Sequence, residues 1–424
     1  MSSYRSLARN RDFTALWIGQ TASTLGSRMS MFVFPLLAFA LTGSAFMAAL
    51  AEALHLLGMA ATLLPAGVLA DRLDRRRVMR LASGTGVALY ASLALAGILG
   101  QLGMVHLLGV SLVTGVCAGA FAPAETSAVR TVVSTEELPT ALAQNQAREH
   151  VAGLIGAPLG GALYAVARWL PFAADAVTYA ISWVMLGRIR TDLSAIPHVG
   201  DPRRLRTDLA TGARFVLGQP FFRTLLCWSA LTNLLVNALF FVAVLRLIQD
   251  GVDPVHLGLV ETVAGAAGIL GAIAAPWIID RFATGALTVV IAWSFLPLLI
   301  PLALWNSPVV VASALAIVLL LNPAGNAGIG AYRLAVTPPD LVGRVQSFSQ
   351  FASMAAMPLA PVLGGAALTV LGGTRAVLAF GLLVAATALI PTLSHTIRAV
   401  PRPAVWRAAL EEIGDDATPV AAVA

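Results

Sequence analysis

The chain has 424 residues, of which 58% are hydrophobic and only 11% are charged. A soluble domain carries about 25% charged residues, so this composition excludes a globular enzyme on an anchor and indicates a polytopic membrane protein. The 27 basic residues are all arginines, and the net charge of +6 reflects arginine-rich loops rather than nucleic-acid binding. Cys117 and Cys227 lie in apolar segments and predict neither a disulfide framework nor a metal site.

Apolar runs of about 20 residues predict membrane-spanning helices. The chain contains twelve, at 13–40, 45–70, 79–100, 104–128, 141–167, 170–188, 221–247, 254–279, 285–305, 308–331, 343–371 and 374–396. The predicted fold class is an all-α membrane protein with twelve transmembrane helices. With both termini in the cytoplasm, only Arg168, Arg246 and Arg375 fall outside, and Arg28 lies within the first span. The opposite orientation would invert this distribution, which favours the N-in, C-in topology.

The longest polar stretch divides the chain into two halves. We predict an N-terminal six-helix half over 1–188, a cytoplasmic linker over 189–220, a C-terminal six-helix half over 221–397 and a cytoplasmic tail over 398–424. The earlier spans of the two halves repeat at a fixed offset, which aligns Glu52 with Glu261 and the pair Asp71-Arg72 with Asp280-Arg281. The later spans repeat at a shorter offset, which places Arg130 on Arg333. Two pseudo-symmetric bundles related by an axis along the membrane normal are therefore expected.

A short basic loop joins the second and third spans, with the sequence GVLADRLDRRRV over residues 67–78. It resembles the loop 2–3 signature of the major facilitator superfamily (MFS), although a generic cytoplasmic loop is the alternative. The resemblance implies a conformational motif. Its expected members are Gly67, Asp71, Arg72, Asp74, Arg75 and Arg76, with Asp280 and Arg281 in the second half and the pair Glu125 and Arg130 in span 4.

Further segments are similar to the macrolide-efflux and enterobactin-exporter-like branch of MFS drug exporters, namely residues 9–17, 41–45, 123–124 and 156–161. This resemblance implies secondary active export of a small amphipathic molecule, usually against protons. Span 5 is also similar to the antiporter motif of these exporters, with its proline one residue late. Its candidate helix-packing residues are Gly153, Gly156, Pro158, Gly160 and Gly161. They predict a bendable seam that prevents leak, or else ordinary small-residue packing.

Arg28 is the most costly residue to place in the membrane. It lies roughly 22 Å along span 1, where an unpaired arginine costs at least ~2.5 kcal/mol. Glu52 in span 2 is its predicted partner, and His55 follows one turn later. We hypothesise that Glu52 exchanges the coupling proton, with Arg28 or His55 changing its affinity, and that Glu261 plays a related part. The alternative is a structural ion pair, or a glutamate that faces water.

Paired amides mark two spans of the second half. Asn233 and Asn237 share one face of span 7, and Asn322 and Asn326 share one face of span 10. The four asparagines could serve either to contact the substrate or to pack against neighbouring helices, and the sequence leaves both interpretations open. The expected cavity, lined by spans 1, 4, 7 and 10, also includes Thr24 and Arg28. Glu125 is expected to pair with Arg130 or the basic loop, and Asp175 to be a solvated or helix-capping acid.

The sequence contains no catalytic triad, phosphate loop or metal cluster. We therefore expect no enzyme and no cofactor, with energy supplied by an ion gradient. The predicted function is secondary active export of a small hydrophobic or amphipathic compound, such as a drug, an antibiotic or a siderophore-like molecule, by proton antiport and alternating access. We expect a monomer in the inner (cytoplasmic) membrane, with a small-molecule substrate, protons and the lipid bilayer as partners and no nucleic acid. The alternatives are a proton-coupled importer or facilitator of a metabolite, or a non-transporting sensor or partner subunit.

Overall fold

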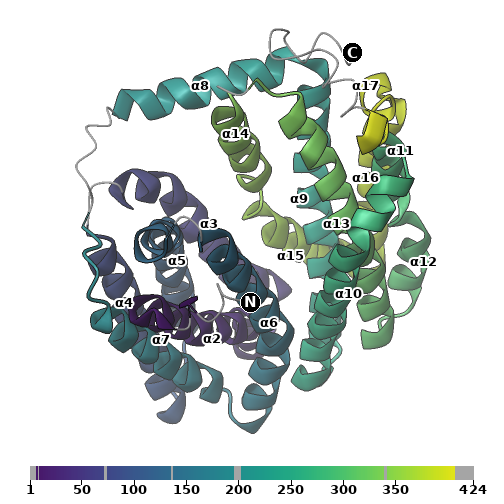
Figure 1. Ribbon diagram of the computed structural model, residues 1–424. Helices are drawn as coiled ribbons and strands as arrows, with labels where there is room; N and C mark the ends of the chain where they lie inside the picture. The colour runs from purple at the N-terminus through teal and green to yellow at the C-terminus, as the bar shows by residue number, and fades with distance from the viewer. Residues whose placement is uncertain are drawn as a thin grey trace. The chain divides into compact units, whose positions relative to one another are not determined.

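The computed structural model describes residues 6–7, 9–70, 74–134, 137–194, 202–338 and 341–405, and within these ranges the regular structure is helical, without a strand (Figure 1). Among the described residues, ten helical stretches are long and apolar enough to cross a membrane. The remaining predicted spans correspond to one helix with a polar first half and to a pair of shorter helices. The predicted all-α membrane fold is therefore confirmed.

Each of the first six predicted spans is a single helix. They are α2 (Arg11–Thr42), α3 (Ala45–Ala70), α4 (Arg75–Ile98), α5 (Met104–Val132), α6 (Leu138–Val166) and α7 (Leu170–Arg188). Local sequence sets the ends of α2: the Asn10 side chain accepts hydrogen bonds from the N–H groups of Asp12 and Phe13, and Gly43 ends the helix with a φ of +65°. The Asp74 side chain caps α4 in the same way.

The second half contains more helices than predicted spans. They are α8 (Pro202–Gly218), α9 (Pro220–Gln249), α10 (Pro254–Arg281), α11 (Thr284–Trp293), α12 (Leu296–Leu304), α13 (Pro308–Ala335), α14 (Val342–Met354), α15 (Leu359–Leu371), α16 (Gly373–Leu393) and α17 (His395–Arg398). The predicted span 285–305 is divided into α11 and α12, and 343–371 into α14 and α15. Pro297 is the second residue of α12, and Pro358 directly precedes α15, because proline cannot donate the helical hydrogen bond and is tolerated at a helix start.

The chain forms two compact units. The first contains residues 1–199 and 245–262, and the second contains 200–244 and 263–424. In the first unit, α2 packs on α3, α5, α6 and α7, α4 packs on α5 and α7, and α3 packs on α5. The contact between α3 and α5 is backbone to backbone, because a Cβ added at Gly58, Gly115 or Gly119 would overlap the other helix.

The second unit has its own helix contacts. Helix α11 packs on α13, α16 and α17, α12 packs on α13 and α16, and α8, within the predicted linker, packs on α14. The segment after α17 is tied back to α11, because the Gly285 N–H donates to the Val400 carbonyl over 3.0 Å. This packing brings α9, α11 and α13 around the pocket described below.

Candidate functional site

Four charged side chains from three helices of the first unit form a continuous ion-pair chain. Arg28 on α2 contacts Glu149 on α6, with 3.2 Å between Nη2 and Oε2. Glu149 Oε1 lies 3.3 Å from Nη2 of Arg148, and the same nitrogen lies 2.9 Å from Oε1 of Glu125 on α5. Because opposite charges alternate, each one reduces the cost of holding its neighbour within the membrane.

The two ends of this ion-pair chain differ in exposure. The side chains of Arg148 and Glu125 are 4% and 16% exposed, whereas those of Arg28 and Glu149 are 47% and 40% exposed. Nε and Nη1 of Arg148 are buried and have no hydrogen-bond partner within the described part of the chain. The Glu125–Arg148 end is therefore fixed in the protein interior, and the Arg28–Glu149 end is accessible.

The predicted pairings of these residues were wrong. Arg28 pairs with Glu149 instead of Glu52, because α6 passes α2 closely at this level. Glu125 pairs with Arg148, and Arg130 is exposed. Arg148 and Glu149 escaped prediction, although adjacent charges inside the apolar run 141–167 were a usable signal, since ionisable residues within a span are rare and functional.

The predicted proton-coupling residues lie in the same unit. Glu52 on α3 is half-buried, and Glu261, in the first part of α10, is exposed. His55 is placed differently: its Nδ1 lies 3.3 Å from the Thr114 hydroxyl of α5, which gives it a contact in the α3–α5 interface.

Glycines of α6 allow the close approach of α2. A Cβ added at Gly156 would overlap the Cβ of Arg28, and one at Gly160 would lie 2.9 Å from the Met29 carbonyl oxygen. A Cβ added at Gly161 would overlap the carbonyl of Pro254. These three glycines are therefore required for packing. Gly153, predicted to act with them, has open space around it.

Pro158 of α6 belongs to the same packing region. A Cβ added at Gly258 of α10 would lie only 2.6 Å from the Pro158 Cα and would overlap it. Thr262, one turn further along α10, donates its hydroxyl to the Leu154 carbonyl over 2.9 Å. The start of α10 thus packs on α6 through small residues and one side-chain hydrogen bond.

The basic loop is described only in part. Asp71 and Arg72 lie outside the described residues, and Gly67 lies in the last turns of α3. Beyond the gap, Asp74 forms a 3.5 Å ion pair with Arg77. Arg75 donates to the Thr131 hydroxyl over 3.4 Å, and Arg76 donates to the Thr191 carbonyl over 2.7 Å.

The corresponding residues of the second half are placed at the end of α10. Asp280 and Arg281 are both exposed there. The Arg281 guanidinium lies 5.7 Å from the centre of the Trp277 ring, a distance typical of a cation–π contact.

Asp175 was expected to be a solvated or capping acid, and this expectation was wrong. Its side chain is fully buried in the second turn of α7. Oδ1 accepts a hydrogen bond from the Thr178 hydroxyl over 2.9 Å, and Oδ2 has no partner among the described residues. The side chains of Asp175 and Thr178 press against Gly26 of α2, where a Cβ would overlap both.

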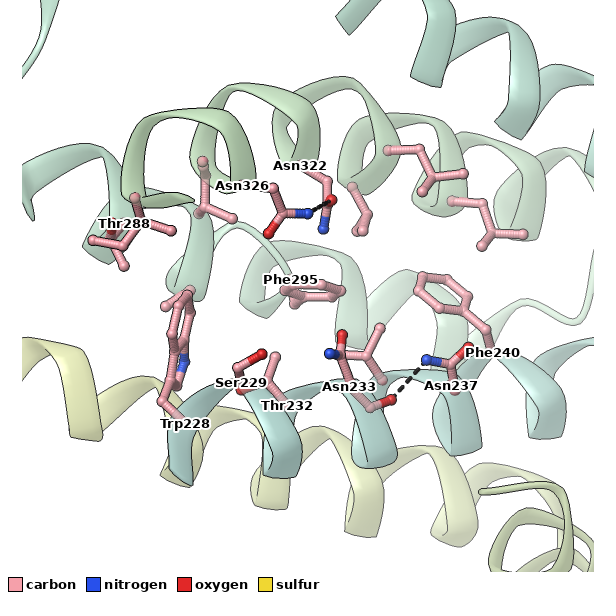
Figure 2. A pocket seen from close by; sticks show the side chains of 18 residues that line it. Trp228, Ser229, Thr232, Asn233, Asn237, Phe240, Thr288, Phe295, Asn322 and Asn326 are labelled. Atoms are coloured by element: carbon pink, nitrogen blue, oxygen red, sulfur yellow. Dashed lines mark hydrogen bonds between the residues drawn. The ribbon is translucent and has the colours of Figure 1, made fainter. Parts of the chain in front are cut away.

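The second unit contains a pocket of about 420 Å³ between α9, α11 and α13. All four predicted amides line it: Asn233 and Asn237 from α9, and Asn322 and Asn326 from α13. Figure 2 shows the two pairs on opposite sides, with the Phe295 ring between them. The Asn237 amide donates to the Asn233 carbonyl over 2.7 Å, and the Asn326 amide donates to the Asn322 side chain.

The rest of the pocket wall is aromatic, aliphatic or hydroxyl-bearing, and none of the described residues that line it is charged. The indole N–H of Trp228 is buried there without a hydrogen-bond partner in the described ranges. Apolar walls with a few fixed polar groups are typical of small-molecule sites. Thr24 and Arg28, predicted to share a cavity with the amides, lie on α2 of the first unit and do not line this pocket.

Apolar helices of bilayer length, charged residues held within them and a polar-lined pocket together define a multi-pass membrane protein with the parts of a transporter. The sequence profile of the Major Facilitator Superfamily matches residues 16–331. The chain therefore belongs to this superfamily, and it is a transporter rather than an enzyme.

Solved structures of low sequence identity share this fold. One is a bacterial homologue of the human lysosomal transporter Spinster, inward-facing and unoccupied (14% identity, TM-score 0.67, covering 92% of this chain and 96% of that one). A second is a bacterial homologue of the iron transporter ferroportin in its inward-facing state. It has 14% identity and a TM-score of 0.68, and the match covers 92% of this chain and 98% of that one. A third is the nucleoside transporter NupG, with 12% identity and a TM-score of 0.66, and the match covers 89% of this chain and 99% of that one. Among curated proteins, none matches this sequence.

Proposed function

We propose that this protein exports a small, uncharged or amphipathic compound through the inner (cytoplasmic) membrane in exchange for protons. The pocket of the second unit is the observation that carries the proposal. Four amides and the Trp228 indole supply donors and acceptors, aromatic and aliphatic side chains supply the remaining wall, and no formal charge is present. A charged metabolite would find no counter-ion there, so an amphipathic cargo that partitions from the lipid suits the pocket best.

Proton coupling is proposed for the charged residues of the first unit. Glu52 and Glu261 remain the candidates named from the sequence, with Arg28 and His55 beside them. The accessible Arg28–Glu149 pair supports adding Glu149, because loss of its negative charge would release Arg28 while Arg148 keeps its pair with Glu125. The glycines of α6 and the basic loop are proposed to act in the conformational change, as packing seam and cytoplasmic latch.

Inside-out vesicles with an acidic lumen test this function. A panel of macrolides, dyes and siderophores is added, and luminal pH is followed. Export in exchange for protons alkalinises the lumen when a transported compound is added. Asn322→Ala should reduce the alkalinisation and raise the compound concentration that gives half of the maximal alkalinisation. Asn306→Ala, outside the pocket, should leave the alkalinisation and this concentration unchanged. Equal responses from the two variants would contradict the pocket assignment.

Three carboxylate variants separate the proton sites. Glu52→Gln, Glu261→Gln and Glu149→Gln remove one charge each within the membrane, and Glu137→Gln, at the N-cap of α6, is the matched control. Loss of alkalinisation in one of the three, with normal expression, identifies the coupling carboxylate. If all three respond like the control, proton coupling at these residues is wrong. Acidification on adding a compound would indicate the importer alternative, because the proton would then move in the opposite sense.

A further inference from the structure

A basic pocket lies at the inner ends of α2, α4 and α7 and shares no residue with the ion-pair chain. Its volume is about 830 Å³. Four arginines line it: Arg11 from α2, Arg76 from α4, and Arg188 and Arg190 from the end of α7. Within the described ranges, none of the four forms an ion pair. The pocket therefore presents several guanidinium groups whose charge is not neutralised by a direct partner.

The nearby carboxylates do not neutralise this pocket. Asp12 lines it, but its oxygens accept the N–H of Arg190 over 3.1 Å, the N–H of Thr191 over 2.7 Å and the Thr191 hydroxyl over 2.5 Å. Asp192 is exposed beside it. Hydrogen bonds from Ser194 and the charge of Arg76 lower the pKa of Asp192, so this carboxylate is ionised at neutral pH. Among the described residues, four cations thus face two anions, so this part of the chain gives the pocket a net positive charge.

Apolar side chains continue from the pocket toward the membrane interior. Ala15, Ile18 and Met185 form part of its wall, and Ile18 is 43% exposed. One turn deeper on α7, Trp183 and Val184 are exposed as well. A site for a free anion needs no such surface. Guanidinium groups at the level of the membrane surface, with exposed apolar side chains directly below, match the two parts of a phospholipid.

We propose that this pocket binds the headgroup phosphate of an anionic phospholipid, with the acyl chains against the exposed apolar side chains of α2 and α7. The arginine distribution places this end of the helices at the cytoplasmic surface, where basic pockets between membrane helices bind anionic headgroups. Arginine matches phosphate geometry through its planar fork of donors. A bound lipid would hold the inner ends of three helices together.

Lipid retention by the purified full-length chain tests the proposal without any transport measurement. The protein is delipidated in detergent and titrated with phosphatidylglycerol, cardiolipin or phosphatidylcholine, and bound lipid is measured by native mass spectrometry. The anionic lipids should bind at a saturable site, and phosphatidylcholine should bind at least tenfold more weakly. The double substitution Arg188→Gln and Arg190→Gln should weaken anionic-lipid binding at least tenfold, since each cation contributes about 1 kcal/mol.

The control removes the same charge elsewhere. Arg398→Gln with Arg402→Gln changes two exposed arginines of the second unit and should leave lipid binding unchanged. Arg11→Gln, on a different helix, repeats the test in case the double variant does not fold. Equal weakening by both double variants would mean general attraction to a positive surface and overturn the proposal. Displacement of the lipid by millimolar glycerol phosphate would also overturn it, because the site would then recognise a free phosphate.

Discussion

Arg28 on α2 and Glu149 on α6 form an ion pair of 3.2 Å, at the level where Gly156 lets the two helices touch. The pair gives the intramembrane arginine its counter-charge and leaves both side chains about half exposed. Glu149 also pairs with Arg148, which continues the ion-pair chain into the protein interior. The carboxylate that neutralises Arg28 thus comes from the helix that packs on α2 through this glycine.

Arg28 and Glu149 should be weakly coupled in stability. Because both side chains are about half exposed, a double-mutant cycle with Arg28→Gln and Glu149→Gln should give a coupling free energy of only ~0.2–1 kcal/mol. Thermal unfolding of the purified variants in detergent measures it. A coupling of several kcal/mol would mean that the pair is buried from solvent, contrary to the exposure found here.

Arg148 should matter far more for stability. Arg148→Gln leaves the Glu125 carboxylate, which is only 16% exposed, without its counter-charge. Removal of one partner of a buried pair costs about 3–5 kcal/mol, so the unfolding temperature should fall strongly. Arg130→Gln, the exposed alternative partner on α5, should change stability by less than about 0.5 kcal/mol. A larger effect at Arg130 than at Arg148 would contradict the pairing.

The glycines of α6 should divide into two classes. Gly156→Ala places a methyl group on the Arg28 Cβ and should destabilise the protein by several degrees or prevent its accumulation. Gly153→Ala, three residues earlier on the same helix, meets open space and should be neutral or stabilising by up to about 1 kcal/mol, because alanine favours the helix. Expression level and unfolding temperature report both effects, and similar losses at the two positions would refute the packing assignment.

Asp12 should hold the end of α7 to the start of α2. Asp12→Ala removes the acceptor of two backbone N–H groups and the Thr191 hydroxyl, which should cost about 1–3 kcal/mol. Asp192→Ala, on an exposed carboxylate a few residues away, is the matched control and should have little effect. Unfolding temperatures decide the comparison. Indistinguishable variants would show that the Asp12 contacts add no net stability.

The sequence by itself determined the order of the apolar spans and their approximate extent. The bilayer sets a minimum length for an apolar run, and this constraint acts on each segment separately. For the same reason the spacing of Asn233 with Asn237, and of Asn322 with Asn326, correctly placed each pair on one helix face. The proline positions also explain why two predicted spans became helix pairs, although the break points emerged only in the structure.

Only the tertiary structure decided which residues from different helices meet. Glu125 had a sequence neighbour of opposite charge in Arg130, but the packing of α5 on α6 gives it Arg148. Asp175, judged by its distance from the end of α7, was expected to face water, yet Gly26 admits it into the interior of the first unit. Ion pairs and pockets depend on how helix faces are turned toward one another, and that rotation is fixed by side-chain packing spread over the whole unit rather than by any local pattern.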